Sequence, residues 1–281
     1  MKVAVSGANG YLGSHVVEKL LKYGHEVVAI DVKFDNISAD VERVNENIFS
    51  SDESIFHKLG EPDCLIHLAW RDGFNHASLN HMGDLSNHYK FLINMLNGGL
   101  TYLSVMGSMH EVGYHEGEIN ENTICNPMSQ YGVAKNSLRE ALIDIISRNY
   151  KTVAFHWLRG FYIIGDDIKS NSIFAKIINA EKRGDKLFPF TSGVNKYDFI
   201  DIDTMAEQIA LASTQNEICG IINCCSGVPV SLGEKVEEFI KNNNFKIKLE
   251  YNAFPDRVYD SPIIYGDNSK INTIMSHYKK N

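Results

Sequence analysis

Three polar residues have the types and the spacing that proton transfer to an oxygen requires. Tyr131 and Lys135 are four residues apart in a segment with helical periodicity, so they lie on one face of the predicted helix. An ammonium beside a phenol stabilises the phenolate and lowers its pKa, which permits the proton exchange that carbonyl–alcohol chemistry needs. Ser108 lies upstream, in a loop predicted to leave a strand, and its hydroxyl could bond the same substrate oxygen. These residues predict a Ser–Tyr–Lys catalytic set.

The Tyr–Lys spacing is a weak signal when it stands alone. About one such pair is expected by composition in a chain with 13 tyrosines, so an exposed pair on a helix is the alternative. The catalytic interpretation therefore depends on the elements around the pair.

A glycine-rich turn near the start of the chain supplies that context. Gly7, Gly10 and Gly13 lie between the apolar run 3–5 and a helix-periodic segment that stops at Gly24. Glycines allow a tight turn and the close approach of a diphosphate, and the free N–H groups of a helix N-terminus favour an anion. The G-x-x-G-x-x-G spacing predicts a dinucleotide site; a glycine-rich turn without a ligand is the alternative.

Asp31 indicates which dinucleotide the site prefers. It ends the next predicted strand, 26–31, where a carboxylate would accept hydrogen bonds from the adenosine ribose hydroxyls. A carboxylate repels the extra phosphate of NADP, so NAD(H) is expected to be preferred. NADP(H) stays possible, because Lys33 could soften that repulsion, and Asp31 could instead be a solvated residue at a strand end.

Strand and helix signals alternate along the chain, which predicts an α/β fold with a doubly wound parallel sheet of the Rossmann type. After Gly165 the pattern loosens. We therefore expect a dinucleotide-binding domain at 1–164 and mainly a nucleotide-sugar-binding cap at 165–281, with segments that return to the first domain. The predicted strands are 3–5, 26–31, one ending near 48–49, 64–70, 100–105 (with 104–113 as its outgoing loop), 152–158, 218–224 and the short 246–249. The predicted helices are 12–23, 52–59, 79–96, 129–148, 173–183, 203–213 with Asp203 as its cap, 232–240 and one near 269.

Composition excludes several classes of function. The formal net charge of the 281 residues is −8 and no basic stripe is present, which argues against nucleic-acid binding. The apolar runs are too short to cross a membrane, and a strand predicted to start at Lys2 leaves no room for a signal peptide. We expect a cytoplasmic protein with no membrane partner.

Cysteine and histidine spacing gives no metal site. The five cysteines fit neither a zinc site nor a disulfide framework, and three of them, Cys64, Cys224 and Cys225, are expected to pack as small apolar residues in a reducing compartment. The remaining two are Cys125 and Cys219. The irregularly spaced His76, His81 and His88 are expected to be solvated or partly buried rather than metal ligands.

Taken with these motifs, the chain resembles the extended branch of the short-chain dehydrogenase/reductase superfamily, the NAD-dependent epimerase/dehydratase family. The matching segments run through nearly the whole chain: 7–13, Asp31, 67–70, 104–113, Pro127, 131–135, 158–162, 198–203 and 226–230. Three segments, 161–165, 190–193 and 257–262, resemble the small reductases of nucleotide-linked 4-keto-6-deoxyhexoses.

The resemblance implies a nucleotide-sugar substrate under the cap, and a homodimer formed through the helices 79–96 and 129–148. It implies cofactor contacts by Gly7, Asn9, Gly10, Tyr11, Leu12, Gly13, Asp31, Leu68, Ala69, Tyr131 and Lys135. It also implies catalysis by Ser108, Tyr131 and Lys135, and substrate contacts by Ser108, Met109, Tyr162, Lys196 and Arg257.

Two positions depart from the family pattern. Tyr162 stands where many members have an Asn that contacts the sugar nucleotide, and Tyr197 where many have an Arg that reaches the diphosphate. Lys196 or Arg257 could take over the phosphate contact.

The expected function is NAD(P)H-dependent reduction of the C4 ketone of a nucleotide-linked 4-keto-6-deoxyhexose, such as dTDP-4-dehydro-6-deoxyglucose. A nucleotide-sugar 4-epimerase that uses the same residues with tightly held NAD is the first alternative. A non-catalytic dinucleotide sensor is the second, although a sensor would not need Ser108, Tyr131 and Lys135.

Overall fold

The computed structural model describes residues 1–50, 52–165, 172–256 and 260–278. The first strands are β1 (Lys2–Ser6), β2 (Glu26–Asp31), β3 (Glu42–Asn45), β4 (Cys64–His67), β5 (Tyr102–Ser108), β6 (Gly117–Ile119) and β7 (Ala154–Gly160). The later strands are β8 (Tyr162–Ile164), β9 (Leu187–Pro189), β10 (Lys196–Asp201), β11 (Gly220–Cys224), β12 (Pro229–Ser231), β13 (Lys248–Glu250) and β14 (Ile263–Gly266). The helices are α1 (Gly13–Lys22), α2 (Ile55–Lys58), α3 (Asn80–Gly83), α4 (Leu85–Gly98), α5 (Gln130–Asn149), α6 (Ile173–Arg183), α7 (Ile202–Ser213), α8 (Leu232–Asn242) and α9 (Ser269–Tyr278), with 3-10 turns η1 (Ile48–Ser50) and η2 (Met109–Glu111).

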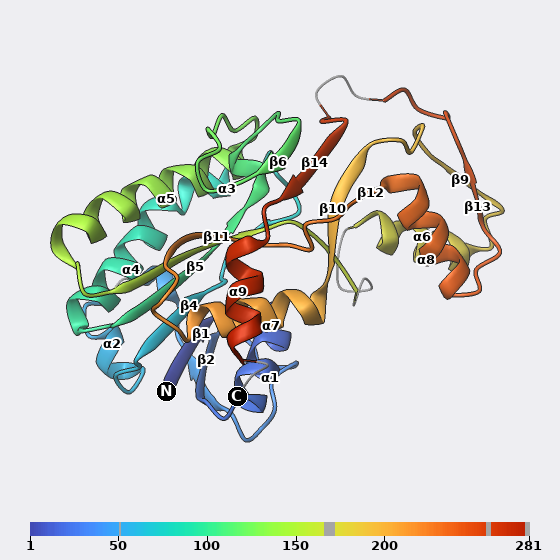
Figure 1. Ribbon diagram of the computed structural model, residues 1–281. Coiled ribbons are helices and arrows are strands. Elements are labelled where there is room, and N and C mark those ends of the chain that lie inside the picture. The colour runs from blue at the N-terminus through green and yellow to red at the C-terminus, as the bar shows by residue number, and fades with distance from the viewer. Residues whose placement is uncertain (51, 166–171, 257–259, 279–281) are drawn as a thin grey trace.

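A parallel sheet of seven strands forms the centre of the larger part of the molecule. Its strands follow the order β3-β2-β1-β4-β5-β7-β11. Continuous apolar runs such as Val3–Val5 are fully buried, as a strand covered on both faces requires. Helices α1, α7 and α9 cover one face, and α2, α4 and α5 cover the other (Figure 1). The predicted doubly wound α/β fold is confirmed. The strand order reverses between β1 and β4, and ligands of such sheets bind beyond the carboxyl ends of the strands at that point.

The chain after β8 supplies both a smaller unit and returning segments. Helices α6 and α8 pack with the β9–β13 pair around a separate apolar cluster that includes Phe174, Ile177, Val236 and Ile240 (Figure 1). Helices α7 and α9 and strand β11 return to the large sheet. A second sheet, β12-β10-β14-β6, lies between the two regions and contains strands from both halves of the sequence.

Several predicted boundaries were wrong, each for a local reason. The predicted helix 79–96 is two helices that meet at Asp84, whose carboxylate receives two hydrogen bonds from Arg71, both 2.9 Å. The strand expected to end near 48–49 is β3, which ends at Asn45; the turn η1 follows it, and the Asn47 side chain accepts from the N–H of Phe49 there. The cap of α7 is Asp201, which accepts from the N–H groups of Asp203 and Thr204.

Two strand ends also differ from the prediction. Strand β5 continues to Ser108 instead of stopping at 105, because its pairing with β7 extends to that residue, where Ser108 faces Gly160. Strand β4 ends at His67, earlier than the predicted 70. None of the described helices is long and apolar enough to cross a membrane.

The predictions for the cysteines and histidines had mixed outcomes. Cys64, Cys224 and Cys225 are buried, as expected. His81 and His88 were predicted to be solvated or partly buried, but each is only 1% exposed, because aromatic rings and hydrogen bonds cover them. Within the described residues, no group of His, Cys, Asp and Glu could hold a metal ion.

Candidate active site

Ser108 is the last residue of β5 and caps the turn that follows. Its backbone is extended, with φ −152° and ψ 145°, and its Oγ accepts from the N–H of His110 at 3.3 Å. Because this bond uses the oxygen as an acceptor, the hydroxyl hydrogen is free to donate elsewhere. The strand end thus presents a directed hydroxyl at the carboxyl edge of the sheet.

Helix α5 brings Tyr131 and Lys135 to the same edge. Ser129 starts the helix by accepting from the N–H of Gly132 at 3.1 Å. A Cβ at Gly132 would lie 2.3 Å from the carbonyl oxygen of His110, so only glycine lets the first turn of α5 contact η2 so closely. The glycine between the two predicted catalytic residues therefore sets their distance from the Ser108 turn.

Tyr131 is partly buried, with aromatic rings packed around it. Burial raises the pKa of its phenol to about 12, and a hydrogen bond with the Ser108 hydroxyl opposes that rise. The expected lowering of this pKa by Lys135 is not found, because desolvation dominates. The ring of His76 stacks on the ring of Tyr131, with centroids 4.9 Å apart and an interplanar angle of 10°. A phenol held in this way is protonated at neutral pH, which suits an acid.

Lys135 is held by two contacts beside the phenol. Its Nζ donates to the carbonyl oxygen of Met106 at 2.7 Å and lies 3.7 Å from the centroid of the Trp70 ring. The same Nζ is 5.9 Å from the centroid of the Tyr131 ring. Burial lowers the pKa of Lys135 to about 7, and the charge of Glu111 opposes this. The ammonium is therefore close to its titration point at neutral pH.

The glycine turn has the geometry that a diphosphate needs. Gly7 has φ +74°, and a Cβ there would lie 2.6 Å from the backbone nitrogen of Ala69. A Cβ at Gly13 would lie 2.1 Å from the carbonyl oxygen of Gly7 and one at Gly10 would lie 3.1 Å from it. Side chains at these positions would push the turn away from the sheet, so the glycines keep the N-terminus of α1, which begins after Leu12, open to an anion.

Asp31 lies beside this turn with acceptor capacity to spare. One carboxylate oxygen accepts from the N–H of Asn9 at 3.0 Å and the other from the N–H of Val32 at 2.7 Å. Each oxygen can accept a further bond, so the carboxylate could hold two ribose hydroxyls. Tyr11, on the same turn, donates to the carbonyl oxygen of Gly165 at 2.5 Å and so ties the turn to the end of β8.

A pocket of about 180 Å³ opens between the glycine turn, β2 and η1. Its lining residues include Gly7, Asp31, Phe49, Ala69 and Trp70. Leu68, which precedes Ala69, is not a lining residue; its N–H donates to the carbonyl oxygen of Ser6. The residues present fit a dinucleotide. The glycine turn can hold the diphosphate, Asp31 can accept from ribose hydroxyls, and Phe49 and Trp70 are aromatic residues of the lining.

The predicted substrate-binding residues do not all lie at the candidate active site. The centroid of the Tyr162 ring lies 6.1 Å from that of the His110 ring and 4.8 Å from that of the Tyr197 ring. Tyr162 therefore reaches the edge of the sheet where the predicted catalytic residues lie. The Met109 side chain is buried in an apolar cluster, and Lys196 is exposed at the start of β10. Arg257 lies outside the described residues.

Comparison with known proteins decides the family. The model of the NAD dependent epimerase/dehydratase family matches residues 3–225. The chain belongs to this family. A dTDP-6-deoxy-L-talose 4-dehydrogenase (NAD(+)) from Aggregatibacter actinomycetemcomitans is 45% identical over 272 residues, which cover 95% of this chain and 99% of the relative.

More distant family members include epimerases. A probable UDP-arabinose 4-epimerase 1 from Oryza sativa subsp. japonica is 27% identical over 318 residues, covering 98% of this chain and 74% of the relative. The crystal structure of a UDP-glucuronic acid 4-epimerase from Bacillus cereus, in complex with UDP-glucuronic acid and NAD, has a TM-score of 0.81 at 23% identity. It covers 98% of this chain and 93% of that one. This last likeness shows the shared fold.

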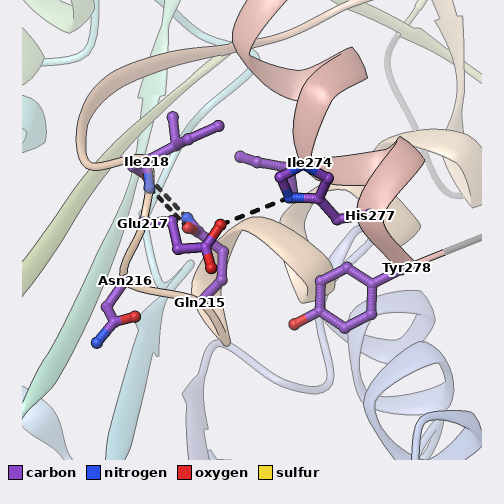
Figure 2. A pocket seen from close by; sticks show the side chains of 7 residues that line it. All are labelled: Gln215, Asn216, Glu217, Ile218, Ile274, His277 and Tyr278. Atoms are coloured by element: carbon purple, nitrogen blue, oxygen red, sulfur yellow. Dashed lines mark hydrogen bonds and ion pairs between the residues drawn. The ribbon is translucent and has the colours of Figure 1, made fainter. Parts of the chain in front are cut away.

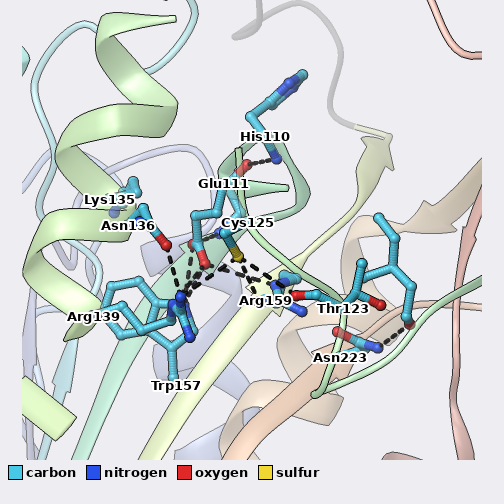
Figure 3. A network of polar contacts seen from close by, with 12 residues as sticks. His110, Glu111, Thr123, Cys125, Lys135, Asn136, Arg139, Trp157, Arg159 and Asn223 are labelled. Atoms are coloured by element: carbon cyan, nitrogen blue, oxygen red, sulfur yellow. Dashed lines mark hydrogen bonds and ion pairs between the residues drawn. The ribbon is translucent and has the colours of Figure 1, made fainter. Parts of the chain in front are cut away.

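Four residues of the candidate site were not predicted from the sequence: Trp70 as the ring beneath Lys135, His76, His110 and Glu111. The Ser108–Glu111 spacing is that of a capping box, so it could have identified Glu111. Nothing in the sequence pattern could have placed His76, because a loop brings it to Tyr131. Figure 3 shows Glu111 at the centre of a polar network just behind the catalytic edge.

A second pocket, of about 260 Å³, lies away from this edge. It is formed by the segment between α7 and β11 and by helix α9, where His277 and Glu217 form an ion pair at 3.5 Å (Figure 2). None of the predicted catalytic, cofactor or substrate residues lines it. It therefore contributes nothing to the candidate active site.

Proposed function

We propose that this protein reduces the C4 ketone of a dTDP-linked 4-keto-6-deoxyhexose with NADH. The observation that carries the proposal is the meeting of Ser108, Tyr131 and Lys135 at the edge of the sheet beside the glycine turn. The 45% identical relative supports the substrate class, since oxidation at C4 of dTDP-6-deoxy-L-talose is such a reduction in reverse. The corresponding ketone is dTDP-4-dehydro-6-deoxy-L-mannose, because oxidation removes the stereocentre at C4.

The residues divide the work as follows. NADH, when bound, supplies the hydride that C4 accepts. The Tyr131 phenol gives its proton to the oxygen that gains charge, and the Ser108 hydroxyl donates a hydrogen bond to the same oxygen. The Lys135 ammonium, fixed by the Met106 carbonyl, attracts the phenolate that is left; before the proton moves, burial outweighs this attraction, so the phenol of Tyr131 stays protonated. The product is a C4 alcohol, and the phenol regains its proton from water.

Asp31 and Asn9 support a preference for NADH over NADPH. A phosphate on the adenosine ribose would lie against the Asp31 carboxylate, which repels it. Asp31→Ala should narrow the ratio of kcat/KM for NADH to that for NADPH. An unmutated protein that uses NADPH as well as NADH would refute the preference.

The test of the substrate class is an NADH oxidation assay with dTDP-, CDP-, GDP- and UDP-linked 4-keto-6-deoxyhexoses. We expect the highest kcat/KM with a dTDP-linked ketone. Absence of NADH oxidation with every ketone, by protein that binds NADH, would refute the proposed reduction.

A 4-epimerase is the second candidate, favoured by the relatives at 27% identity and below. An epimerase regenerates its cofactor on the enzyme and so keeps it bound, whereas a reductase exchanges it at each turnover. Extraction of the purified protein should therefore yield little NAD; a stoichiometric amount would favour the epimerase.

We also propose the wider setting of this activity. Residues 165–281 act mainly as the cap that holds the nucleotide sugar, with Tyr162 at its inner edge. The protein is a cytoplasmic homodimer that pairs through α4 and α5, where Ile143 is exposed on the outer face. Light scattering at several concentrations tests the dimer, and a monomer at all of them would refute it.

A further inference from the structure

Glu111 is a carboxylate that the proposed reaction does not use, yet it is fully buried beside the catalytic residues. Its Oε1 accepts from the backbone N–H of Ser108 at 2.6 Å. The indole N–H of Trp157 donates to both carboxylate oxygens, at 3.0 Å each. A buried charge of this kind is costly unless donors surround it, so its surroundings must be built for it.

Two guanidinium groups complete those surroundings. The Nε atoms of Arg139 and Arg159 lie 3.6 Å and 3.7 Å from Oε2 of Glu111 (Figure 3). Arg139 is on α5, one turn beyond Lys135, and Arg159 is on β7. Every partner of the carboxylate among the described residues is a donor, which is the arrangement that an ionised carboxylate requires.

The backbone leaves space for this carboxylate. A Cβ at Gly107 would lie 2.2 Å from Nε1 of Trp157 and 2.7 Å from Oε1 of Glu111. Glycine at this position of β5 is thus needed for the two side chains to meet. Glu111 thereby joins the end of β5, the centre of β7 and the helix that carries Tyr131 and Lys135.

The charge of Glu111 also acts on both catalytic groups. It raises the pKa of Lys135, against the lowering by burial, and it raises the pKa of Tyr131. Burial raises the pKa of Glu111 itself, and the guanidiniums and N–H donors oppose that rise. The titratable or charged groups that face it are Tyr131, Lys135 and Arg139 on α5, Arg159 on β7 and Cys125 in the loop before α5; the ring of His110, on η2, points away from it (Figure 3).

We propose that Glu111 is a positioning residue for the reduction: it fixes the Ser108 turn against α5 and supplies the negative charge beside Lys135. This inference rests on the proposed function. Without the carboxylate, the Ser108 hydroxyl loses the bond that fixes its backbone, and two guanidiniums and an ammonium face one another in a buried space.

The test compares Glu111→Gln with Glu234→Gln. Glu234 closes a capping box with Ser231 at the start of α8, on the exposed surface, so it is a matched control. In Glu111→Gln we expect kcat to fall by about 10²-fold with KM for NADH unchanged. We also expect the fall of kcat at alkaline pH, its alkaline limb, to begin about one pH unit lower. The reason is that the groups of Tyr131 and Lys135 both lose a neighbouring negative charge that raises their pKa values. Glu234→Gln should leave all three quantities unchanged.

Trp157→Phe keeps the charge of Glu111 and removes the indole N–H that donates to it. This second variant allows the inference to be tested even if Glu111→Gln does not fold. It should lower kcat while leaving the alkaline limb in place. A limb that moves as far in Trp157→Phe as in Glu111→Gln would refute the electrostatic role. Unchanged kcat and limb in a folded Glu111→Gln would refute the whole inference.

An activity-independent measurement separates this inference from the proposed function. NMR of protein labelled at the lysine Cε carbons follows the titration of Lys135, which should shift to lower pH in Glu111→Gln and stay in place in Glu234→Gln. Hydrogen exchange of the peptide 104–113 should become faster only in Glu111→Gln. If no ketone is reduced by the unmutated protein, the proposed function fails, and these two measurements still decide the role of Glu111.

Discussion

The same local motif occurs at two places in this chain with very different surroundings. Ser108 and Glu111 form a capping box at η2, and Ser231 and Glu234 form one at the start of α8. In both, the serine oxygen accepts from a backbone N–H, and the glutamate accepts from the N–H of the serine. Glu111 is fully buried between Trp157 and two guanidiniums, whereas Glu234 is exposed.

The comparison shows that the Ser–Glu spacing determines the hydrogen bonds of the capping box. The surroundings of the box determine whether those bonds also serve the candidate active site. An exposed box satisfies the N-terminus of a helix and does little else. At η2 the box lies at the carboxyl edge of the central sheet, so the same bonds direct the Ser108 hydroxyl toward Tyr131. Matched variants at the two capping boxes and at the groups around them test whether function follows the surroundings.

The largest change in kcat is expected at Tyr131, whose phenol contacts Ser108 of the buried capping box. Tyr131→Phe removes the oxygen that Ser108 contacts, so kcat should fall by about 10²–10⁴-fold while NADH binding survives. Tyr23→Phe is the matched control, since burial also raises the pKa of Tyr23 to about 12, but its partner is Glu207 on α7. Equal kcat in the two variants would show that the Tyr131–Lys135 spacing is a coincidence of composition.

Stability should separate the two carboxylates. Glu111→Ala removes the buried carboxylate between the guanidiniums of Arg139 and Arg159, although Arg139 keeps its ion pair with Glu140, so the free energy of unfolding should fall by about 3–5 kcal/mol. Glu234→Ala affects only an exposed cap and should cost much less. Urea denaturation of both variants measures the difference, and similar losses would contradict the distinction between the two boxes.

The serines give a smaller contrast in rate. Ser108→Ala should lower kcat by about 10²-fold, because it removes a donor to the substrate oxygen. Ser231→Ala should leave kcat unchanged, although it removes the same kind of cap. Steady-state assays of both variants are sufficient, and a loss of kcat in Ser231→Ala alone would overturn the assignment.

The smallest expected effect is a pH dependence. Burial lowers the pKa of Lys135 to about 7, so its ammonium is lost as the pH rises through that value. Tyr131, with a pKa of about 12, stays protonated throughout. Reduction needs both protons in place, so kcat/KM should fall about tenfold per pH unit above this pKa. A profile that is flat from pH 6 to pH 9 would contradict the assigned state of Lys135.

The sequence predicted the layers of this fold well because buried strands and amphipathic helices leave strong periodic signals. The glycine turn and the Ser108, Tyr131 and Lys135 positions followed from spacing, and their roles stay predictions. The elevated pKa of Tyr131 could not be foreseen, since it depends on burial by rings such as that of His76, which arrive from distant loops. The break at Asp84, whose carboxylate binds Arg71, falls inside a segment with helical periodicity, so periodicity alone does not show it.

The most direct test of the account counts NADH against product in the unmutated protein. Purified protein, freed of bound cofactor, is mixed with NADH and dTDP-4-dehydro-6-deoxy-L-mannose, and both NADH and the C4 alcohol are measured over time. We predict one NADH oxidised for each ketone reduced, and no conversion without added NADH. Interconversion of two 4-hydroxy sugars with no net change in NADH would contradict the proposed reduction and establish the epimerase instead.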